Sequence, residues 1–277
     1  ASQESDRAGK KLTPTVKKCG HHVRLYEGAF FLNRTKPSQV LSCKPGDENL
    51  RVVAGEGAPI NGFNRVQYVW GVAMLPNGEM IVGHGDANEG SQLLSFQDGV
   101  GKVLLDVPDL IDVCCSPNGV IYVLDADGRR VQKVEGSRLM PVVDSKELAE
   151  EHAFDASCIF VSKQEVLYIS DSANARILRF TEGTSVPTIV DDFGDRDGVK
   201  LAGLFVTENE RIFVCDYYNC QILMTDTGEN TCCSELDVSE LGKPCDLLVQ
   251  DGFLNVLIEE GREGWVQQFV LPPTLKP

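Results

Sequence analysis

Two aspartates and one histidine are the residues of this chain that could hold a divalent cation. Asp112 and Asp246 each stand one residue before a short apolar run, and counting places His21 at the equivalent point of an earlier run. Carboxylate oxygens and imidazole nitrogens both bind divalent metals. The other equivalent positions carry no carboxylate or amide, because they are Gly71, Cys158 and Gly203. The alternative is that both aspartates are solvated or bonded to backbone amides.

These positions are equivalent because the chain repeats itself. In residues 166–180 an apolar run, a polar turn on Asp171 and Asn174, and a second apolar run predict a β-hairpin. Matching runs are centred on Phe31, Ile81, Tyr122, Tyr168, Phe213 and Val256, at spacings of 50, 41, 46, 45 and 43 residues. Hairpins with a period in the forties are typical of propeller blades. The sequence therefore predicts an all-β, six-bladed β-propeller of four-stranded antiparallel blades.

The last blade lacks a fourth strand of its own, since the chain ends in a proline-containing tail. A spare strand at residues 12–17 is predicted to complete that blade, which would remove an open sheet edge. Residues 1–11 are then a flexible tail, and residues 12–277 a single propeller domain. Between blades, a helical turn capped by Ser145 is expected at 145–151, an irregular loop at 55–68, and an outer strand at 229–233.

Two hairpins, at residues 168–177 and 213–222, resemble the NHL repeat, in which an aromatic–apolar pair is followed by Asp, two residues and Asn. The third blade departs from that pattern, since it has Asp125 but no Asn, and the first, second and sixth blades depart further. The resemblance implies a six-bladed propeller. It implies no single activity, because NHL-like propellers serve as protein-binding platforms, RNA-binding domains and enzymes.

The turns between second and third strands form a ring on the face that also carries the blade connections. Asp171 and Asp216 of this ring are predicted to stabilise their own turns. Positions that depart from the repeat are better candidates for binding a partner. The predicted partner-binding residues are Arg34, His84 and Glu259, together with the turn tyrosines Tyr217 and Tyr218.

Ten cysteines are present, without Cys-x-x-Cys spacing, and most are expected to be buried free thiols. Cys215 and Cys220 flank a four-residue turn and could form a cross-strand bridge. The net charge of −15 disfavours a nucleic-acid partner. No apolar run approaches the roughly 20 residues of a transmembrane helix. The missing initiator Met indicates a processed or trimmed chain of unassigned location.

Catalytic motifs such as Gly-x-Ser-x-Gly and His-Glu-x-x-His are absent. Lactonases of the regucalcin and gluconolactonase group bind metal in the propeller channel through acidic and amide side chains, a set that this chain does not reproduce. The leading hypothesis is therefore a non-catalytic scaffold without cofactor, binding a partner protein or belonging to a larger assembly. The alternative is a metal-dependent, lactonase-like hydrolase or lyase with a divalent cation in the central channel.

Overall fold

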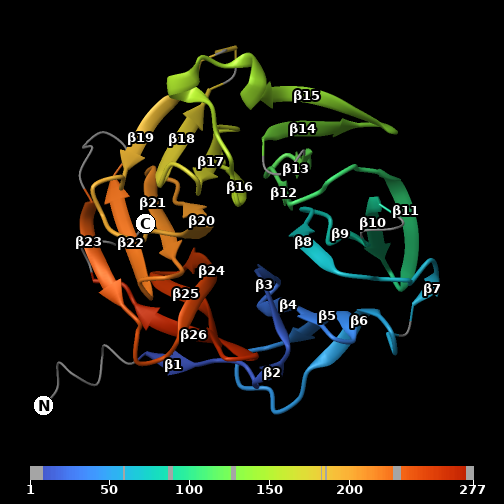
Figure 1. Cartoon of the computed structure of the whole chain (residues 1–277). Helices are drawn as coiled ribbons and strands as arrows, with labels where there is room; N and C mark the ends of the chain where they lie inside the picture. Colours follow the sequence, from blue (N-terminus) through green and yellow to red (C-terminus); the bar gives the residue numbers. More distant parts are fainter. Residues whose placement is uncertain are drawn as a thin grey trace, which may run out of the picture.

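The structure, a computed structural model, describes residues 9–272 except 59, 87–89, 126–128, 182, 185 and 227–231. Six sheets surround a central channel like the blades of a propeller (Figure 1). Within each blade, neighbouring strands pair antiparallel in chain order, from the channel outward. The predicted all-β, six-bladed architecture with four-stranded blades is confirmed.

The innermost strands line the channel: β3 (Cys19–Tyr26), β8 (Val69–Met74), β12 (Asp112–Cys115), β16 (Cys158–Val161), β20 (Leu201–Val206) and β24 (Lys243–Gln250). The second strands are β4 (Ala29–Thr35), β9 (Met80–Asp86), β13 (Ile121–Asp125), β17 (Leu167–Asp171), β21 (Arg211–Asp216) and β25 (Phe253–Glu260). The third strands are β5 (Ser38–Cys43), β10 (Gly90–Gln97), β14 (Arg130–Glu135), β18 (Arg176–Phe180), β22 (Gln221–Asp226) and β26 (Glu263–Val270). The outer strands are β6 (Arg51–Gly55), β11 (Val100–Asp106), β15 (Arg138–Asp144), β19 (Thr188–Asp192) and β23 (Cys232–Asp237).

The sixth blade is completed by the N-terminal part of the chain, as predicted. Strands β1 (Lys10–Lys11) and β2 (Val16–Lys17) both pair antiparallel with β26. Pairing thus starts at Lys10, inside the predicted tail, and residues 12–15 of the predicted strand connect β1 to β2 without being part of a strand. Leu12 and Val16 are buried against this blade. Residues 1–8 of the predicted tail lie outside the described residues.

The hydrophobic core lies between adjacent blades. Side chains alternate across each strand, so every blade has two apolar faces and must cover both. At one shared level, each innermost strand contributes a buried apolar residue: Val23, Val72, Val113, Ile159, Leu204 and Leu247. This stacking holds the six innermost strands in fixed positions around the channel.

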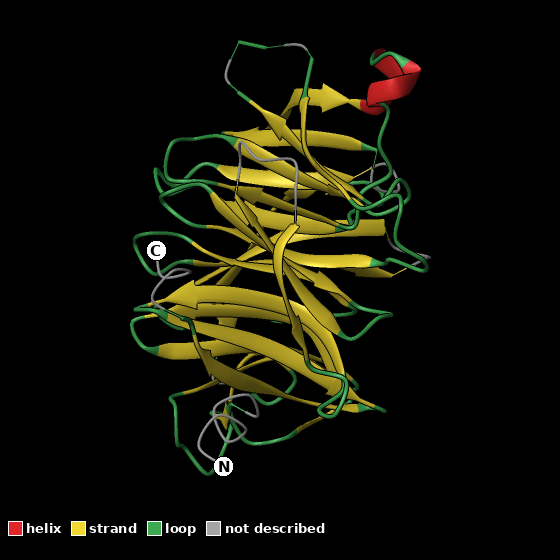
Figure 2. Cartoon of the chain, turned by 90° about the vertical axis from the view of Figure 1, so that its left-hand side faces the viewer, coloured by secondary structure: helices red, strands yellow, loops and turns green. Residues whose placement is uncertain are grey.

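Two sequence-based expectations need correction, and a third lies partly outside the described residues. The segment after β15 forms two 3₁₀ turns, η1 (Ser145–Glu147) and η2 (Glu150–His152) (Figure 2). The side chain that caps η1 is Asp144, not Ser145. The Ser145 hydroxyl instead bonds the backbone of Phe154. The loop at 55–68 contains a short strand, β7 (Asn61–Gly62), parallel to β11. Strand β23 begins at Cys232, and residues 229–231 of the strand predicted there lie outside the described residues.

The considered bridge between Cys215 and Cys220 is not formed. Cys215 pairs across the hairpin with Ile222, and Cys220 lies in the turn with a φ of 54°. The eight cysteines that the structure describes are all free, and five of them are buried. Among the described residues no helix is long and apolar enough to cross a membrane.

Candidate metal centre

The channel-lining ring contains His22 in place of the predicted His21. Strand β3 has a bulge: Cys19 pairs with Arg34 and Val23 with Leu32, so four steps on β3 match two steps on β4. A bulge adds residues without partners and shifts everything beyond it. Counting from sequence could not detect these extra residues.

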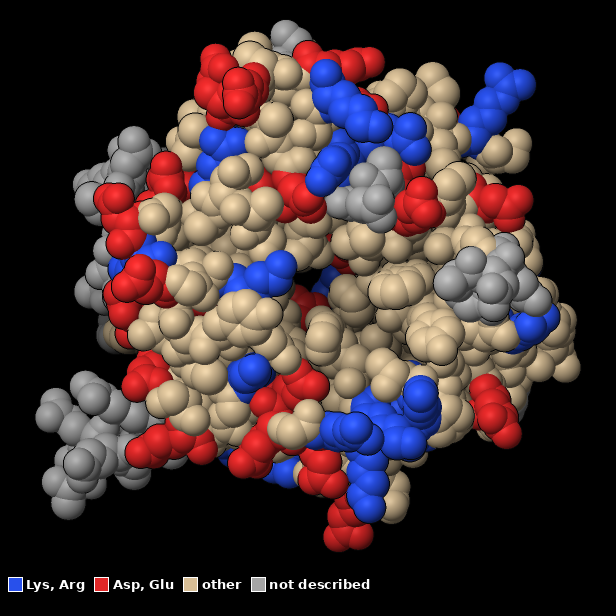
Figure 3. All heavy atoms as spheres, in the orientation of Figure 1, with Lys and Arg blue, Asp and Glu red and all other residues tan. Residues whose placement is uncertain are grey.

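Asp246 is engaged in the centre of the channel by a residue that the sequence analysis missed, Arg24. The Oδ2 atom of Asp246 lies 2.6 Å from Nη1 of Arg24 and also accepts the N–H of Val23 at 3.0 Å. Oδ1 accepts the N–H of Leu247 at 2.9 Å. Figure 3 shows the central opening of the disk, with basic and acidic atoms in its depth.

Asp112 is also bonded to backbone amides. Its two oxygens accept the N–H groups of Val113 at 2.8 Å and Ile159 at 3.1 Å. Burial raises the pKa of Asp112 to about 6, although the Arg24 charge opposes this shift. His22 Nδ1 lies 3.9 Å away, and burial, followed by the charges of Arg24 and His21, lowers the pKa of His22 to about 3.

A calcium ion in this channel would fit poorly. Ca²⁺ takes six to eight oxygen ligands, whereas the Asp112 and Asp246 oxygens are committed to backbone amides and a guanidinium. Gly203 at an equivalent position cannot be replaced by a ligand, because a Cβ there would lie 2.4 Å from the Cα of Asp246. The structure thus favours the alternative in which both aspartates are structural, and it does not bring His21 together with them.

His21 belongs to a different group, with Cys245 and Glu259. Ligand atoms of these three side chains all lie within 4.8 Å of one another. His21 Nε2 is 3.6 Å from Glu259 Oε2, and Cys245 Sγ is 3.8 Å from the same oxygen. Cys245 is buried, the Glu259 side chain is 17% exposed and the His21 side chain 60% exposed, so the group opens to solvent on one side.

Two of these three residues lie on β-bulges of adjacent innermost strands. His21 lies in the bulge of β3, and Cys245 in the bulge that separates Pro244 from Asp246 on β24. Glu259 is near the end of β25, opposite Lys243. Bulges redirect side chains and are frequent beside active sites. All three residues lie on what we call the loop face, which carries the blade connections and the turns between second and third strands.

Tyr217 from the fifth blade completes the surroundings of Glu259. Its hydroxyl donates to Oε2 of Glu259 at 2.8 Å, and the Lys243 ammonium lies 4.7 Å from the ring centre. Burial, together with this bond to Glu259, raises the pKa of Tyr217, so the hydroxyl remains a donor. Burial and then Glu259 raise the pKa of Cys245 well above its usual value, so it is a neutral thiol when no metal is bound.

The predicted partner-binding residues do not form one surface. Glu259 and Tyr217 are bonded to each other, and Tyr218 is 61% exposed beside them. His84 is buried in the second blade and accepts the N–H of Gln67, while the Arg34 guanidinium bonds the Gln39 side chain.

The aspartates in the turns between second and third strands hold the neighbouring loops in place. Asp171 accepts bonds from the side chains of Asn174 and Arg176, both at 2.8 Å, and from the N–H of Asp155 at 3.0 Å. Asp216 accepts from the Asn219 side chain and from the N–H of Lys200. The predicted turn-stabilising role thus extends to the neighbouring blade connection.

The fold and its channel define the chain as a six-bladed β-propeller. It is similar to a calcium-binding protein, regucalcin, from Agrobacterium tumefaciens, with a TM-score of 0.70, 13% identity and coverage of 95% of this chain and 94% of the other. It is also similar to a gluconolactonase from Xanthomonas campestris, with a TM-score of 0.68, 13% identity and coverage of 97% of this chain and 93% of the other. A third similar structure is virginiamycin B lyase from Staphylococcus aureus, with a TM-score of 0.63, 11% identity and coverage of 93% of this chain and 88% of the other.

At such low identity these likenesses show the fold alone. No protein-family model matches the chain, and no curated protein matches it in sequence. The NHL pattern of single hairpins therefore stays a resemblance. The predicted non-catalytic scaffold gains no support from these structural neighbours.

Proposed function

We propose that this propeller is a metal-dependent hydrolase or lyase whose metal is held by His21, Cys245 and Glu259 on the loop face. The observation that carries the proposal is the convergence of three different ligand atoms within 4.8 Å. This keeps the alternative function drawn from the sequence but moves its metal from the channel centre to the edge between the first and sixth blades. Fold neighbours named as a lactonase and a lyase agree with such an activity.

The ligand set favours zinc over calcium or magnesium. A thiolate and an imidazole are ligands for Zn²⁺, whereas Ca²⁺ and Mg²⁺ prefer oxygen. Tetrahedral Zn²⁺ with ligand bonds of about 2.0–2.3 Å needs neighbouring ligand atoms roughly 3.3–3.8 Å apart. Two of the three ligand pairs meet that requirement, at 3.6 and 3.8 Å from Glu259 Oε2, and the third pair, His21 and Cys245, lies within 4.8 Å.

Three protein ligands leave a fourth position for water or substrate, as in catalytic zinc sites. The exposed side of His21 gives a small substrate access to this position. A bound zinc ion would polarise a carbonyl oxygen or lower the pKa of a water molecule. The chain's own residues fix the geometry: Tyr217 orients Glu259, and the bulge of β24 holds the Cys245 thiol in place.

The non-catalytic role predicted from sequence remains a second candidate, favoured by one observation. Tyr218 is exposed on the loop face with the Lys243 ammonium 5.6 Å from its ring centre, and exposed tyrosines often anchor partner proteins. A protein partner bound there would cover the solvent-facing side of His21.

Calorimetry on chelator-treated protein tests the proposal, with Zn²⁺, Ca²⁺ and Mg²⁺ titrated separately. One equivalent of Zn²⁺ should bind, far more tightly than the other two ions. Cys245→Ser and His21→Ala should each weaken Zn²⁺ binding by more than the roughly 10–100-fold typical of losing an outer partner. Cys43→Ser, which changes another buried thiol, should bind Zn²⁺ normally.

Turnover of lactones and esters by the zinc-loaded protein, lost in His21→Ala, would establish the reaction class. Zinc binding that survives both ligand substitutions, or a preference for Ca²⁺, would contradict the proposed metal site. Zinc binding without turnover of any lactone or ester would support the metal site and contradict the hydrolase activity.

A further inference from the structure

A large cavity opens on the other face of the disk, which we call the hairpin face because the turns between first and second strands lie there. Its volume is about 1160 Å³, enough for a drug-sized molecule. The first residues of β3 and β24 carry the proposed metal ligands, whereas the later residues of the same strands line this cavity. The two sites therefore lie at opposite ends of the channel.

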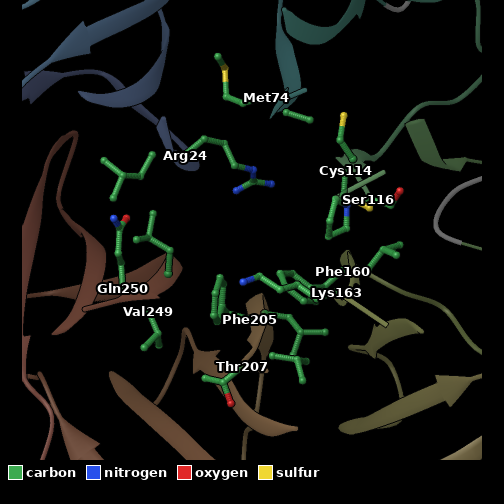
Figure 4. Close-up of a pocket in the computed structure, with 18 of the residues that line it drawn as sticks. Arg24, Met74, Cys114, Ser116, Phe160, Lys163, Phe205, Thr207, Val249 and Gln250 are labelled. Atoms are coloured by element: carbon green, nitrogen blue, oxygen red, sulfur yellow. The ribbon is translucent and has the colours of Figure 1, made fainter. Parts of the chain in front are cut away.

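Arg24 stands at the inner end of the cavity. Figure 4 shows its guanidinium extending from β3 into the middle of the lining residues. The side chain is 23% exposed, so it is reached by solvent through the cavity and not at the outer surface. Within the described part of the chain, one of its three nitrogens is used by the fold: Nη1 donates both to Asp246 and to the carbonyl of Val23.

The remaining two nitrogens of Arg24, Nε and Nη2, form one edge of the guanidinium. Nε and Nη2 have no hydrogen-bond partner among the residues that the structure describes. These two N–H groups point in parallel and match the two oxygens of a carboxylate. Arg130 uses this same edge within the protein: its Nε and Nη2 both lie 2.9 Å from the oxygens of Asp125.

The walls around Arg24 are apolar. At the level of Arg24 the other innermost strands contribute Ala73, Cys114, Phe160, Phe205 and Leu248. The rings of Phe160 and Phe205 come from adjacent blades, with centres 5.0 Å apart. Such walls favour a ligand with an apolar or aromatic body, while polar residues such as Thr207 and Gln250 lie among the lining residues further along the strands.

We propose that this cavity binds an amphipathic carboxylate, with the carboxylate on Nε and Nη2 of Arg24 and an apolar body between Phe160, Phe205 and their neighbours. The site is separate from the proposed metal centre and does not depend on it. Burial of the apolar body and a two-bonded ion pair both contribute to affinity. The Asp246 and Asp112 carboxylates near Arg24 repel a bound carboxylate, so the charge of Asp112 affects the affinity.

Isothermal calorimetry with 4-phenylbutyrate and its uncharged amide tests the proposal on the full chain. The acid should bind with one-to-one stoichiometry and at least about 10-fold more tightly than the amide, given the strength of a paired guanidinium–carboxylate contact. Arg24→Lys keeps a positive charge for Asp246 but loses the planar edge. It should therefore weaken binding of the acid at least about 10-fold and leave binding of the amide unchanged.

Two further variants separate this role from a general effect on folding. Arg130→Lys removes the same kind of edge outside the cavity and should bind the acid like the parent protein. Asp112→Asn removes a competing negative charge near Arg24 and should tighten binding by roughly 3-fold or more. Equal affinity for acid and amide, unchanged binding by Arg24→Lys, or no binding of either compound would overturn the proposal.

Discussion

The guanidinium of Arg24 lies 2.6 Å from the Oδ2 atom of Asp246, and this ion pair lies inside the channel, between its two ends. Asp246 follows Cys245 directly on β24, where the bulge separates their directions. The thiol of Cys245 joins the group on the loop face, while the Asp246 carboxylate meets the residue at the inner end of the cavity. Two consecutive residues thus connect the proposed metal centre with the proposed carboxylate site.

Tyr217→Phe should lower zinc affinity by about 10-fold, because the variant loses the hydroxyl that orients Glu259. Calorimetric titration measures this change. Tyr218→Phe is the matched control, since the neighbouring tyrosine is exposed and should leave zinc affinity unchanged. An equal effect of both substitutions would show that the Tyr217 hydroxyl has no orienting role.

Asp112→Asn should alter the pH dependence of stability. Burial raises the pKa of Asp112 from 3.8 to about 6, so the folded protein holds this proton more tightly than the unfolded chain. The resulting stabilisation is complete below pH 3.8 and is lost as the pH rises through 6, by about 3 kcal/mol in total.

The free energy of unfolding in urea, measured with a chelator at several pH values from 4 to 7.5, tests this prediction. Relative to the parent protein, Asp112→Asn should become more stable as the pH rises. His22 is neutral in the folded protein over this range, because its pKa is about 3. Its contribution to the pH dependence of stability is therefore the same in both proteins. A constant difference between the two proteins would mean that Asp112 is ionised throughout.

Deleting residues 1–18 should lower the melting temperature by roughly 10 °C. The deletion exposes the edge of β26 and removes buried Leu12 and Val16, each worth about 2–3 kcal/mol. Differential scanning calorimetry measures the shift. Leu12→Ala and Val16→Ala in the full chain should each give part of it, and an unchanged melting temperature would refute the closure of the ring by this segment.

Asp171→Ala should cost about 3–5 kcal/mol of stability, because it leaves Arg176 as a buried charge without its carboxylate. Adding Arg176→Met should restore part of the loss. Glu208→Gln is the control: its partner Lys163 is 63% exposed, and exposed pairs contribute less than about 1 kcal/mol. Similar costs in denaturant unfolding would argue against the buried pair as the cause.

The ring of blades was predictable because its signals are local. Alternating apolar residues and turns such as Asp171 to Asn174 need only a few neighbours in sequence, and their repetition reveals the number of blades. The role of β1 and β2 followed from the same count, since one blade lacked a strand.

The candidate sites were less predictable, because they depend on positions that no repeat encodes. Asp112 and Asp246 look like metal ligands in sequence, but neighbouring strands supply amides, and Arg24 a guanidinium, that occupy their oxygens. The sequence places Glu259 and Tyr217 at separate turns, and nothing in it joins them across 42 positions.

Six blades, their turns and the strand that closes the ring can be read from the sequence, since they follow from short-range alternation of side chains. Which residues meet depends on the folded arrangement of the blades. Bulges on β3 and β24 placed His21 and Cys245 beside Glu259, and the circular arrangement of the blades brought Arg24 to Asp246. The reason is geometric, because a bulge of one or two residues changes no composition or period and yet redirects the side chains that a site requires.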